Sequence, residues 1–145
     1  MGGLIQKINE RKSIRTEDIM GEISDNTSLD LLTLLDGTNK KYQINSSTEI
    51  AKRLSITPRK YHKLVARIKK LGLIKLGDSG LQLSSLGVIV VRSIGTIYNA
   101  LDIYSKLRAI DIISMSDATT EEEIHKLIDS LIKDEKIKNI LKRIP

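Results

Sequence analysis

Residues 57–72 carry the strongest structural signal in this chain, a helix with a defined start and a defined end. Thr57 suits the N-cap of a helix, and Pro58 suits the first helical position, where its missing N–H costs nothing. Gly72 suits the position just after a helix, because glycine readily adopts the left-handed conformation found there. The apolar residues between these ends fall at helical spacing: Tyr61, Leu64, Val65, Ile68 and Leu71. The segment is therefore expected to be an amphipathic helix with one side on a core.

A second helix is expected immediately before this one. Ser46 and Glu49 have the spacing of a capping box at its start. Its apolar face consists of Ile50, Ala51 and Leu54. Ser55 and Ile56 then form a turn, so that the order over residues 46–72 is helix, turn, helix.

Shorter elements are expected on either side of this pair. Ser28 is a good N-cap for a short, nearly all-apolar helix over residues 29–35, which a core would bury. Residues 42–44 alternate in polarity and suit a short strand. Residues 73–83 contain two apolar runs around a loop with glycine, which is typical of a β-hairpin.

The C-terminal half is expected to be helical. Ser84 or Ser85 caps a long helix that is expected to continue to about Ile113. Five of its residues repeat at heptad a and d spacing: Val90, Ile94, Ile97, Leu101 and Tyr104. We interpret this seam as a homodimer interface, with packing on the chain's own domain as the alternative. Further helices are expected after Thr119 or Thr120 and over residues 136–144.

Positive charge is concentrated in the central part of the chain. Residues 38–77 hold eleven Lys and Arg but only one acidic residue, Glu49, whereas the whole chain has a net charge of only +6. Residues 115–135 are instead acidic. A basic block of this density within a folded region indicates an anionic partner.

The order of these elements resembles that of archaeal and bacterial winged helix-turn-helix transcription regulators of the MarR/ArsR-like kind. The resemblance covers roughly residues 28–90. Residues 31–37 resemble the first helix of that family, residues 47–54 its second helix and residues 57–71 its recognition helix. Residues 71–74 resemble the segment that leads into the β-wing, and residues 81–87 resemble the segment that returns from the wing into the next helix. Ser55 departs from the family pattern, in which the turn often has glycine.

The resemblance implies a winged helix-turn-helix domain of three helices and a short β-wing. Together with the long C-terminal dimerisation helix and the terminal helices expected from the pattern, it gives a mainly α fold. We divide the chain into an N-terminal arm (1–27), a DNA-binding domain (28–86) and a helical dimerisation region (87–145). The helix over residues 58–71 is expected to lie in the DNA major groove, where N-terminal residues of such helices reach base edges.

The expected DNA contacts divide into two sets. The candidate base contacts are Arg59, Lys60, His62 and Lys63. The candidate phosphate contacts are Lys40, Lys41, Ser47, Thr48, Lys52, Arg53, Thr57, Arg67 and Lys75. The loop of the hairpin has no Lys or Arg of its own, so we expect the wing to contribute little to binding.

We therefore expect a cytoplasmic, homodimeric transcription regulator that binds double-stranded DNA sequence-specifically. The alternatives are non-specific architectural DNA binding of the chromatin type and a winged-helix module for protein–protein interaction. No catalytic motif or metal-ligand set is present in the sequence, so no enzyme activity, metal or cofactor is expected, and no apolar run is long enough to span a membrane. The sequence does not indicate the operator or any small-molecule effector.

Overall fold

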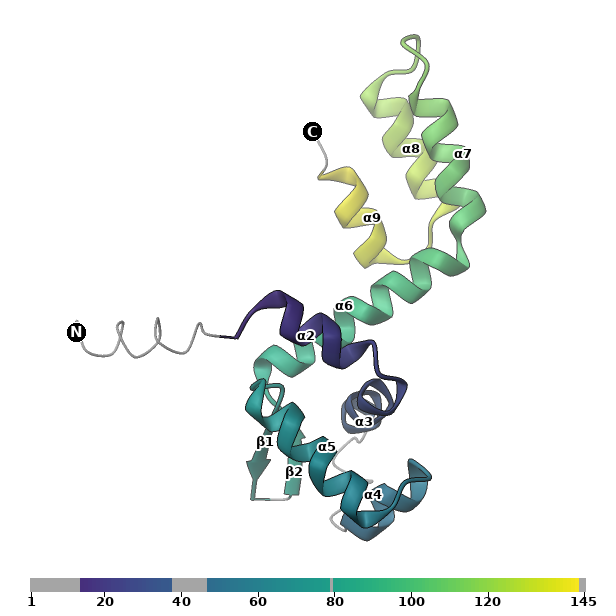
Figure 1. The fold of residues 1–145 in the computed structure, drawn as a ribbon. Helices are drawn as coiled ribbons and strands as arrows, with labels where there is room; N and C mark the ends of the chain where they lie inside the picture. Colours follow the sequence, from purple (N-terminus) through teal and green to yellow (C-terminus); the bar gives the residue numbers. More distant parts are fainter. Residues whose placement is uncertain (1–13, 38–46, 79, 144–145) are drawn as a thin grey trace, which may run out of the picture. The chain divides into compact units, whose positions relative to one another are not determined.

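The computed structural model describes residues 14–37, 47–78 and 80–143 of the chain. The fold is mainly helical with one small two-stranded sheet, which confirms the predicted α-rich class (Figure 1). The chain forms two compact units, Met1–Val91 and Arg92–Pro145. The boundary lies beyond the predicted one at Leu86, because Val90 and Val91 pack into the core of the N-terminal unit.

The N-terminal unit combines helices with the hairpin. Its elements are α2 (Thr16–Ile23), α3 (Asn26–Gly37), α4 (Ser47–Arg53), α5 (Pro58–Lys70), β1 (Ile74–Gly77), β2 (Gly80–Leu83) and the first part of α6 (Ser85–Asp102). β1 and β2 are antiparallel and pair Ile74 with Leu83, as expected for a hairpin. α5 packs on α4 and β1, and α3 packs on α2 and β2.

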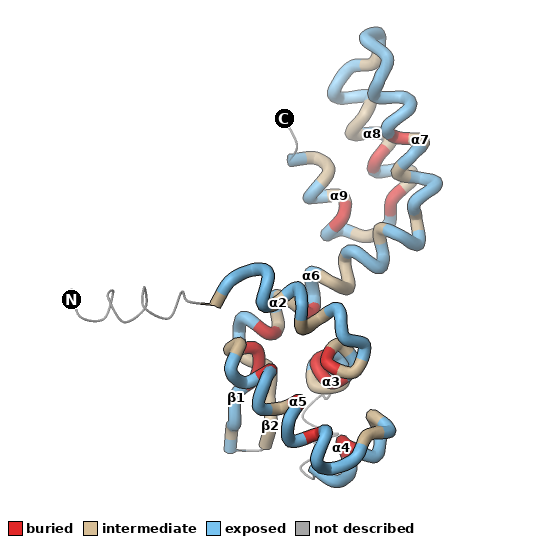
Figure 2. The backbone as a smooth tube through the Cα atoms, viewed as in Figure 1, coloured by how far each residue is buried: buried red, intermediate tan, exposed pale blue. Residues whose placement is uncertain are grey.

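The apolar sides of these elements form one core (Figure 2). Its buried members are Leu31, Leu32, Ile50, Ala51, Tyr61, Leu64, Ile68, Leu73, Ile74 and Val91. Three of them, Tyr61, Leu64 and Ile68, are the predicted inner face of α5. The small Ala51 lies where α4 packs on α5, and its carbonyl accepts a hydrogen bond from the N–H of Ile56. This core therefore leaves the opposite side of α5 exposed.

Both ends of α5 are as predicted. The Thr57 hydroxyl accepts a hydrogen bond from the N–H of Lys60 at 3.2 Å, and Pro58 is the first helical residue. Gly72 follows the helix with φ of +75°. The expected α4–α5 turn is also present, whereas Ser46 and the expected strand at 42–44 lie outside the described residues.

The turn between α4 and α5 requires a left-handed residue. Ser55 has φ of +56° there and is the one described non-glycine residue with positive φ. This conformation costs an L-residue about 1 kcal/mol, and glycine avoids most of that cost. Ser55→Gly is therefore expected to stabilise the unit by about 0.5 kcal/mol.

Chemical denaturation checks this prediction, with Ser130→Gly in helix α8 (Glu121–Leu131) as the control. The control places glycine in an ordinary helix interior, so it is expected to lower the free energy of unfolding by about 0.5 kcal/mol. A loss of stability in both variants would contradict the account of the turn.

The predicted start of α3 is wrong. Ser28 is not an N-cap but lies within α3, where its side chain is completely buried. Its hydroxyl is next to Glu22 at 2.9 Å and Asp25 at 3.3 Å, and these partners make burial of a polar group possible. Asp25 instead accepts a hydrogen bond from the N–H of Thr27 at the start of the helix. The described part of the predicted arm, residues 14–27, therefore packs as part of this unit rather than standing apart from it.

The C-terminal unit contains the rest of α6 and three further helices, α7 (Tyr104–Ser114), α8 and α9 (Glu135–Lys142). Its core comprises Ile110, Ile128, Ile132 and Ile137. The Thr120 hydroxyl accepts a hydrogen bond from the N–H of Glu123 and caps α8, which confirms one of the two predicted caps.

The start of α9 is held by a carboxylate. The Asp134 side chain accepts hydrogen bonds from the N–H groups of Lys136 and Ile137. The bond from Ile137 is the main cause that lowers the pKa of Asp134, and the Asn99 amide also contributes. The carboxylate therefore keeps its charge at the helix N-terminus, where the helix dipole favours a negative group.

The expected single helix up to Ile113 is wrong. It is broken at Ile103, where the backbone leaves the helical conformation and the chain bends by 74° between α6 and α7. The bend allows Ile103 and Leu107 to pack against the core around Ile110. Heptad spacing alone does not reveal this competing burial.

Among the described residues, this bent pair is the one candidate for a membrane span, by length and composition only. No described helix has by itself the length and apolar character needed to cross a bilayer. Helices α6 and α7 meet those two criteria only when they are taken together.

Candidate nucleic-acid interface

The exposed side of α5 carries a dense set of cations and no acidic residue. Arg59, Lys63 and Lys70 recur at intervals that place them on one stripe of the helix, with the small Ala66 between them. Lys60 flanks this stripe on one side, and His62 flanks it on the other. Within the part of the chain that the structure describes, no carboxylate pairs with Arg59, Lys60 or Lys63. Their charges are therefore available to an external anion.

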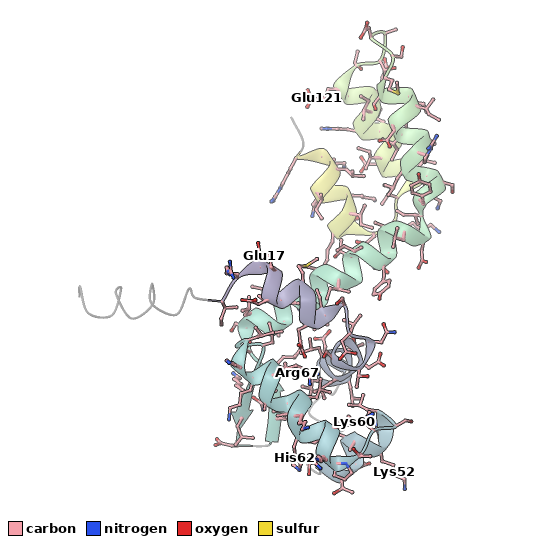
Figure 3. All side chains as sticks on the ribbon, viewed as in Figure 1. Glu17, Lys52, Lys60, His62, Arg67 and Glu121 are labelled. Carbon is pink, nitrogen blue, oxygen red and sulfur yellow. The ribbon has the colours of Figure 1, made fainter. Side chains whose placement is uncertain are left out.

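The four predicted base contacts all lie in the first two turns of α5 and are exposed. Figure 3 shows Lys60 and His62 on this part of the helix, close to α4. The His62 ring meets the ring of Tyr61 edge-on, with 5.6 Å between their centroids. Burial raises the pKa of the Tyr61 hydroxyl, so this side chain stays neutral while it anchors α5 in the core.

The predicted phosphate contacts on α4 are exposed as well. Ser47 and Thr48 lie in its first turn, and Lys52 and Arg53 lie at its end. Arg53 is 3.8 Å from Glu49, and both side chains are 54% exposed. An ion pair this exposed contributes little free energy, so a phosphate can compete for Arg53.

Two further predicted phosphate contacts lie on either side of α5 in the chain. The Thr57 side chain caps α5 and is exposed, and Lys75 is exposed on β1. Leu76, next to Lys75, is 74% exposed. Lys40 and Lys41 lie outside the described residues.

Arg67, another predicted phosphate contact, is ion-paired within the chain. Its Nε lies 3.1 Å from a Glu22 carboxylate oxygen, and one of its terminal nitrogens lies 3.6 Å from Asp25. Neither carboxylate is predictable as a partner from the sequence, because both are about 45 residues away and no motif links them to α5. The guanidinium of Arg67 is thus engaged within the chain.

The predicted dimer seam is only partly exposed. Ile97, Leu101 and Tyr104 are each more than half exposed, and Ile94 is half-buried. Val90 instead packs on the core of the N-terminal unit, and Tyr104 belongs to α7. Tyr98, which is not part of the predicted seam, is 55% exposed. The sequence does contain a pattern that places Tyr98 on the seam. Ile94, Ile97, Tyr98 and Leu101 have the i, i+3, i+4, i+7 spacing of one helix face.

Among the described residues, no three His, Asp or Glu side chains are arranged to hold a metal ion. His125 is 4.0 Å from Glu121 on the next helical turn.

The arrangement on α4 and α5 is that of a surface suited to a polyanion. Comparisons with protein-family models, curated proteins and solved structures find no match for this chain. The geometry and charge of this surface are therefore the evidence that bears on function.

Proposed function

We propose that this protein binds double-stranded DNA sequence-specifically as a homodimeric transcription regulator of the winged helix-turn-helix type. The observation that carries the proposal is the exposed side of α5, which has several cations and no carboxylate of its own. An α-helix fits the major groove of B-DNA, and Arg and Lys side chains there recognise guanine. Arg59, Lys60, His62 and Lys63 are the proposed base contacts.

The helix–turn–helix order supports this mode of binding. The turn at Ser55 holds α4 against α5, and the β1–β2 hairpin follows α5 directly. In proteins of this class the second helix of the motif enters the groove while the first contacts the backbone. Lys52 and Arg53 on α4 are then proposed to contact phosphates, and Lys75 is proposed to do so from the hairpin.

Arg53→Ala is expected to weaken binding to all duplexes alike. Each lost phosphate contact lowers the slope of log K against log salt by about one. Fluorescence anisotropy at several salt concentrations measures that slope. Lys126→Ala on α8 is the matched control, since Lys126 also forms an exposed ion pair one helical turn from its partner. If Arg53→Ala and the wild type have equal salt slopes, Arg53 does not contact a DNA phosphate.

The exposed apolar face of α6 supports self-association. Ile97, Tyr98 and Leu101 form an exposed stripe without a charged side chain. The opposite face of the same stretch is covered within the chain, because Ala100 and Ile103 pack against the core of the C-terminal unit. An uncharged face can meet a second copy of itself without burying an unpaired charge. In dimers of the helix-turn-helix class, the two recognition helices enter successive major grooves.

Leu101→Asp is expected to convert the dimer to a monomer. A carboxylate in the centre of an apolar interface costs several kcal/mol, so the dimer dissociation constant should rise on the order of 100-fold. Sedimentation equilibrium measures this change. Ile89→Asp is the control, because Ile89 is also an exposed apolar residue of α6 but lies on a different face. A wild-type protein that sediments as a monomer would contradict the dimer.

Two other functions remain alternatives. A non-specific architectural DNA-binding protein would use the same cations, and a protein–protein module would pack α5 on a partner. The exposed charges of α5 favour DNA over the module, because protein interfaces are depleted in Lys at their centres.

Selection from a pool of random duplexes at two salt concentrations tests the proposal. We expect an enriched sequence motif at the higher salt concentration, where non-specific binding is weakened. Equal recovery of all duplexes would favour the architectural protein. Failure to retain any duplex at low salt would exclude both DNA-binding functions.

A further inference from the structure

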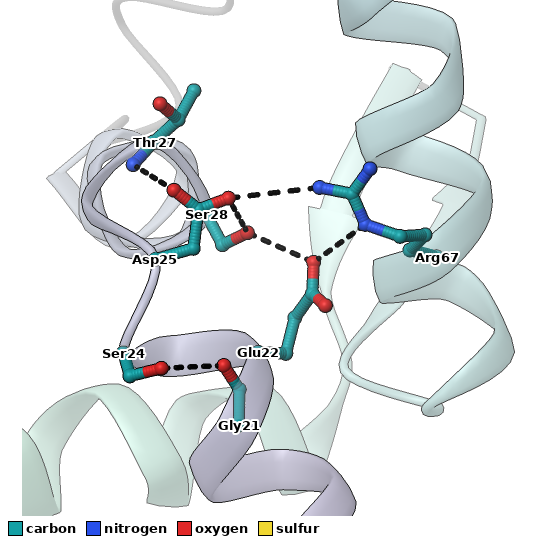
Figure 4. Close-up of polar contacts among 7 residues, drawn as sticks. All are labelled: Gly21, Glu22, Ser24, Asp25, Thr27, Ser28 and Arg67. Carbon is teal, nitrogen blue, oxygen red and sulfur yellow. Dashed lines mark hydrogen bonds and ion pairs between the residues drawn. The ribbon is translucent and has the colours of Figure 1, made fainter.

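Arg67 links the cationic helix to the turn between α2 and α3. Its guanidinium bonds to Glu22 of α2 at 3.1 Å and lies 3.6 Å from Asp25 in the connection to α3 (Figure 4). Arg67 is on the same helix as the proposed base contacts and flanks their face beyond Lys60 and Lys63. Two carboxylates thus reach the edge of the proposed DNA interface.

Glu22 is held more firmly than an ordinary surface carboxylate. Its side chain is only 15% exposed, and the same oxygen that bonds to Arg67 lies 2.9 Å from the buried Ser28 hydroxyl. The Ser28 hydroxyl also lies 3.3 Å from Asp25. A carboxylate that is fixed in this way loses little side-chain entropy when it pairs with Arg67, so the pair is stronger than a mobile surface pair.

A cleft lies beside this network within the N-terminal unit. Lys60, Lys63 and Arg67 line it from α5, Asp25 lines it from the α2–α3 connection, and Leu64 lies between. The Arg67 side chain is 51% exposed on this side. A guanidinium has five N–H donors, and only some of them point at the two carboxylates. The cleft therefore offers Arg67 to a backbone phosphate beside the proposed base contacts Lys60 and Lys63, against the competing charge of Asp25 and Glu22.

We propose that this cleft is a phosphodiester-binding site for the DNA backbone, and that Glu22 and Asp25 limit its affinity by occupying Arg67 in place of a phosphate. The inference rests on the proposed DNA-binding function. Carboxylates and phosphates accept hydrogen bonds from a guanidinium in the same forked geometry, so they compete for it. Because phosphate contacts are the same for every sequence, a weakened contact lowers non-specific binding while the base contacts are retained.

Glu22→Gln tests this competition. The glutamine keeps an oxygen that can accept from Arg67 but removes the negative charge. We expect tighter binding of a mixed-sequence duplex, by about threefold to tenfold at low salt, and a steeper salt slope by about one. Fluorescence anisotropy at several salt concentrations gives both values, and a thermal melt followed by circular dichroism establishes that each variant is folded.

Two further variants separate local competition from a change in net charge. Glu17→Gln makes the same charge change in the exposed first turn of α2 and is expected to leave the slope unchanged. In the double variant Glu22→Gln, Arg67→Gln the slope is expected to return to the wild-type value, because the gain requires Arg67. If Glu22→Gln unfolds, Asp25→Asn makes the same test, since asparagine also caps a helix well.

The outcomes distinguish this inference from the proposed function. A wild-type protein that binds no duplex would overturn both. Duplex binding by the wild type, with equal slopes for Glu22→Gln and Glu17→Gln, would overturn the inference alone. A gain that persists without Arg67 would also overturn it, because the carboxylate would then act on another cation.

Discussion

Gly87→Ala is expected to destabilise the N-terminal unit by about 3 kcal/mol or more, because the added methyl group has no room. A Cβ atom at Gly87 would lie 2.0 Å from the carbonyl oxygen of Leu73, well inside any real contact distance. That oxygen accepts a hydrogen bond from the N–H of Ser84, so it cannot simply move away. Helix α6 therefore approaches the start of the hairpin more closely than any side chain permits.

Gly21→Ala is the matched control for this prediction. Gly21 is also a helical glycine, but a Cβ built there meets nothing within 4 Å. Alanine is a better helix former than glycine, so this variant should gain about 0.5–1 kcal/mol. Urea denaturation followed by circular dichroism compares the two. A Gly87→Ala protein as stable as the wild type would show that α6 does not pack against Leu73 as described.

The second large effect is expected at the exposed cationic side of α5, where we propose that DNA binds. The double variant Arg59→Ala, Lys63→Ala should lose on the order of 100-fold in affinity for its selected duplex, since each base contact is worth about 1–3 kcal/mol. Both side chains are exposed and lie on one stripe of the helix, so their removal should not disturb the core. The preference for bases at the matching positions of the site should also relax.

Lys106→Ala, Lys133→Ala is the control for this variant. It removes the same charge from exposed positions of the C-terminal unit. Its duplex affinity is expected to change by less than about threefold, as screening at physiological salt limits long-range effects. Equal losses in both double variants would mean that net charge, and not the surface of α5, determines binding.

Local signals in the sequence predicted the helix–turn–helix region well. Thr57, Pro58 and Gly72 specify the ends of α5 through capping and backbone preferences that act over a few residues. The cationic side of this helix followed from the same periodicity, because the apolar residues had to face the core. Features of this kind depend on neighbours along the chain and not on distant contacts.

Contacts between residues far apart in the sequence could not be predicted from such local signals. Ser28 looks like a helix cap by type, but Asp25 and Glu22 provide partners that allow it to be buried within α3. The seam through Val90 and Tyr104 suggested one straight helix, whereas burial of Ile103 bends the chain between them. These outcomes depend on which apolar groups find a core, and periodicity alone does not determine that choice.

In the candidate site, too, local features were predictable from the sequence and long-range contacts were not. The exposed positions of Arg59, Lys60, His62 and Lys63 were predictable from the face of one helix. The role of Arg67 was not, because its ion pairs come from a different part of the sequence. The distinction matters for function, since cations with internal partners and cations without them respond differently to a polyanion.

The central claim is that the exposed side of α5 enters a DNA duplex. The most direct measurement is an NMR titration of the labelled protein with its selected duplex, which follows every backbone amide. We expect the largest chemical-shift changes at amides in the first two turns of α5 and at Lys52 and Arg53, with little change in α8. Unchanged α5 amides, with shifts confined to the C-terminal unit, would contradict it.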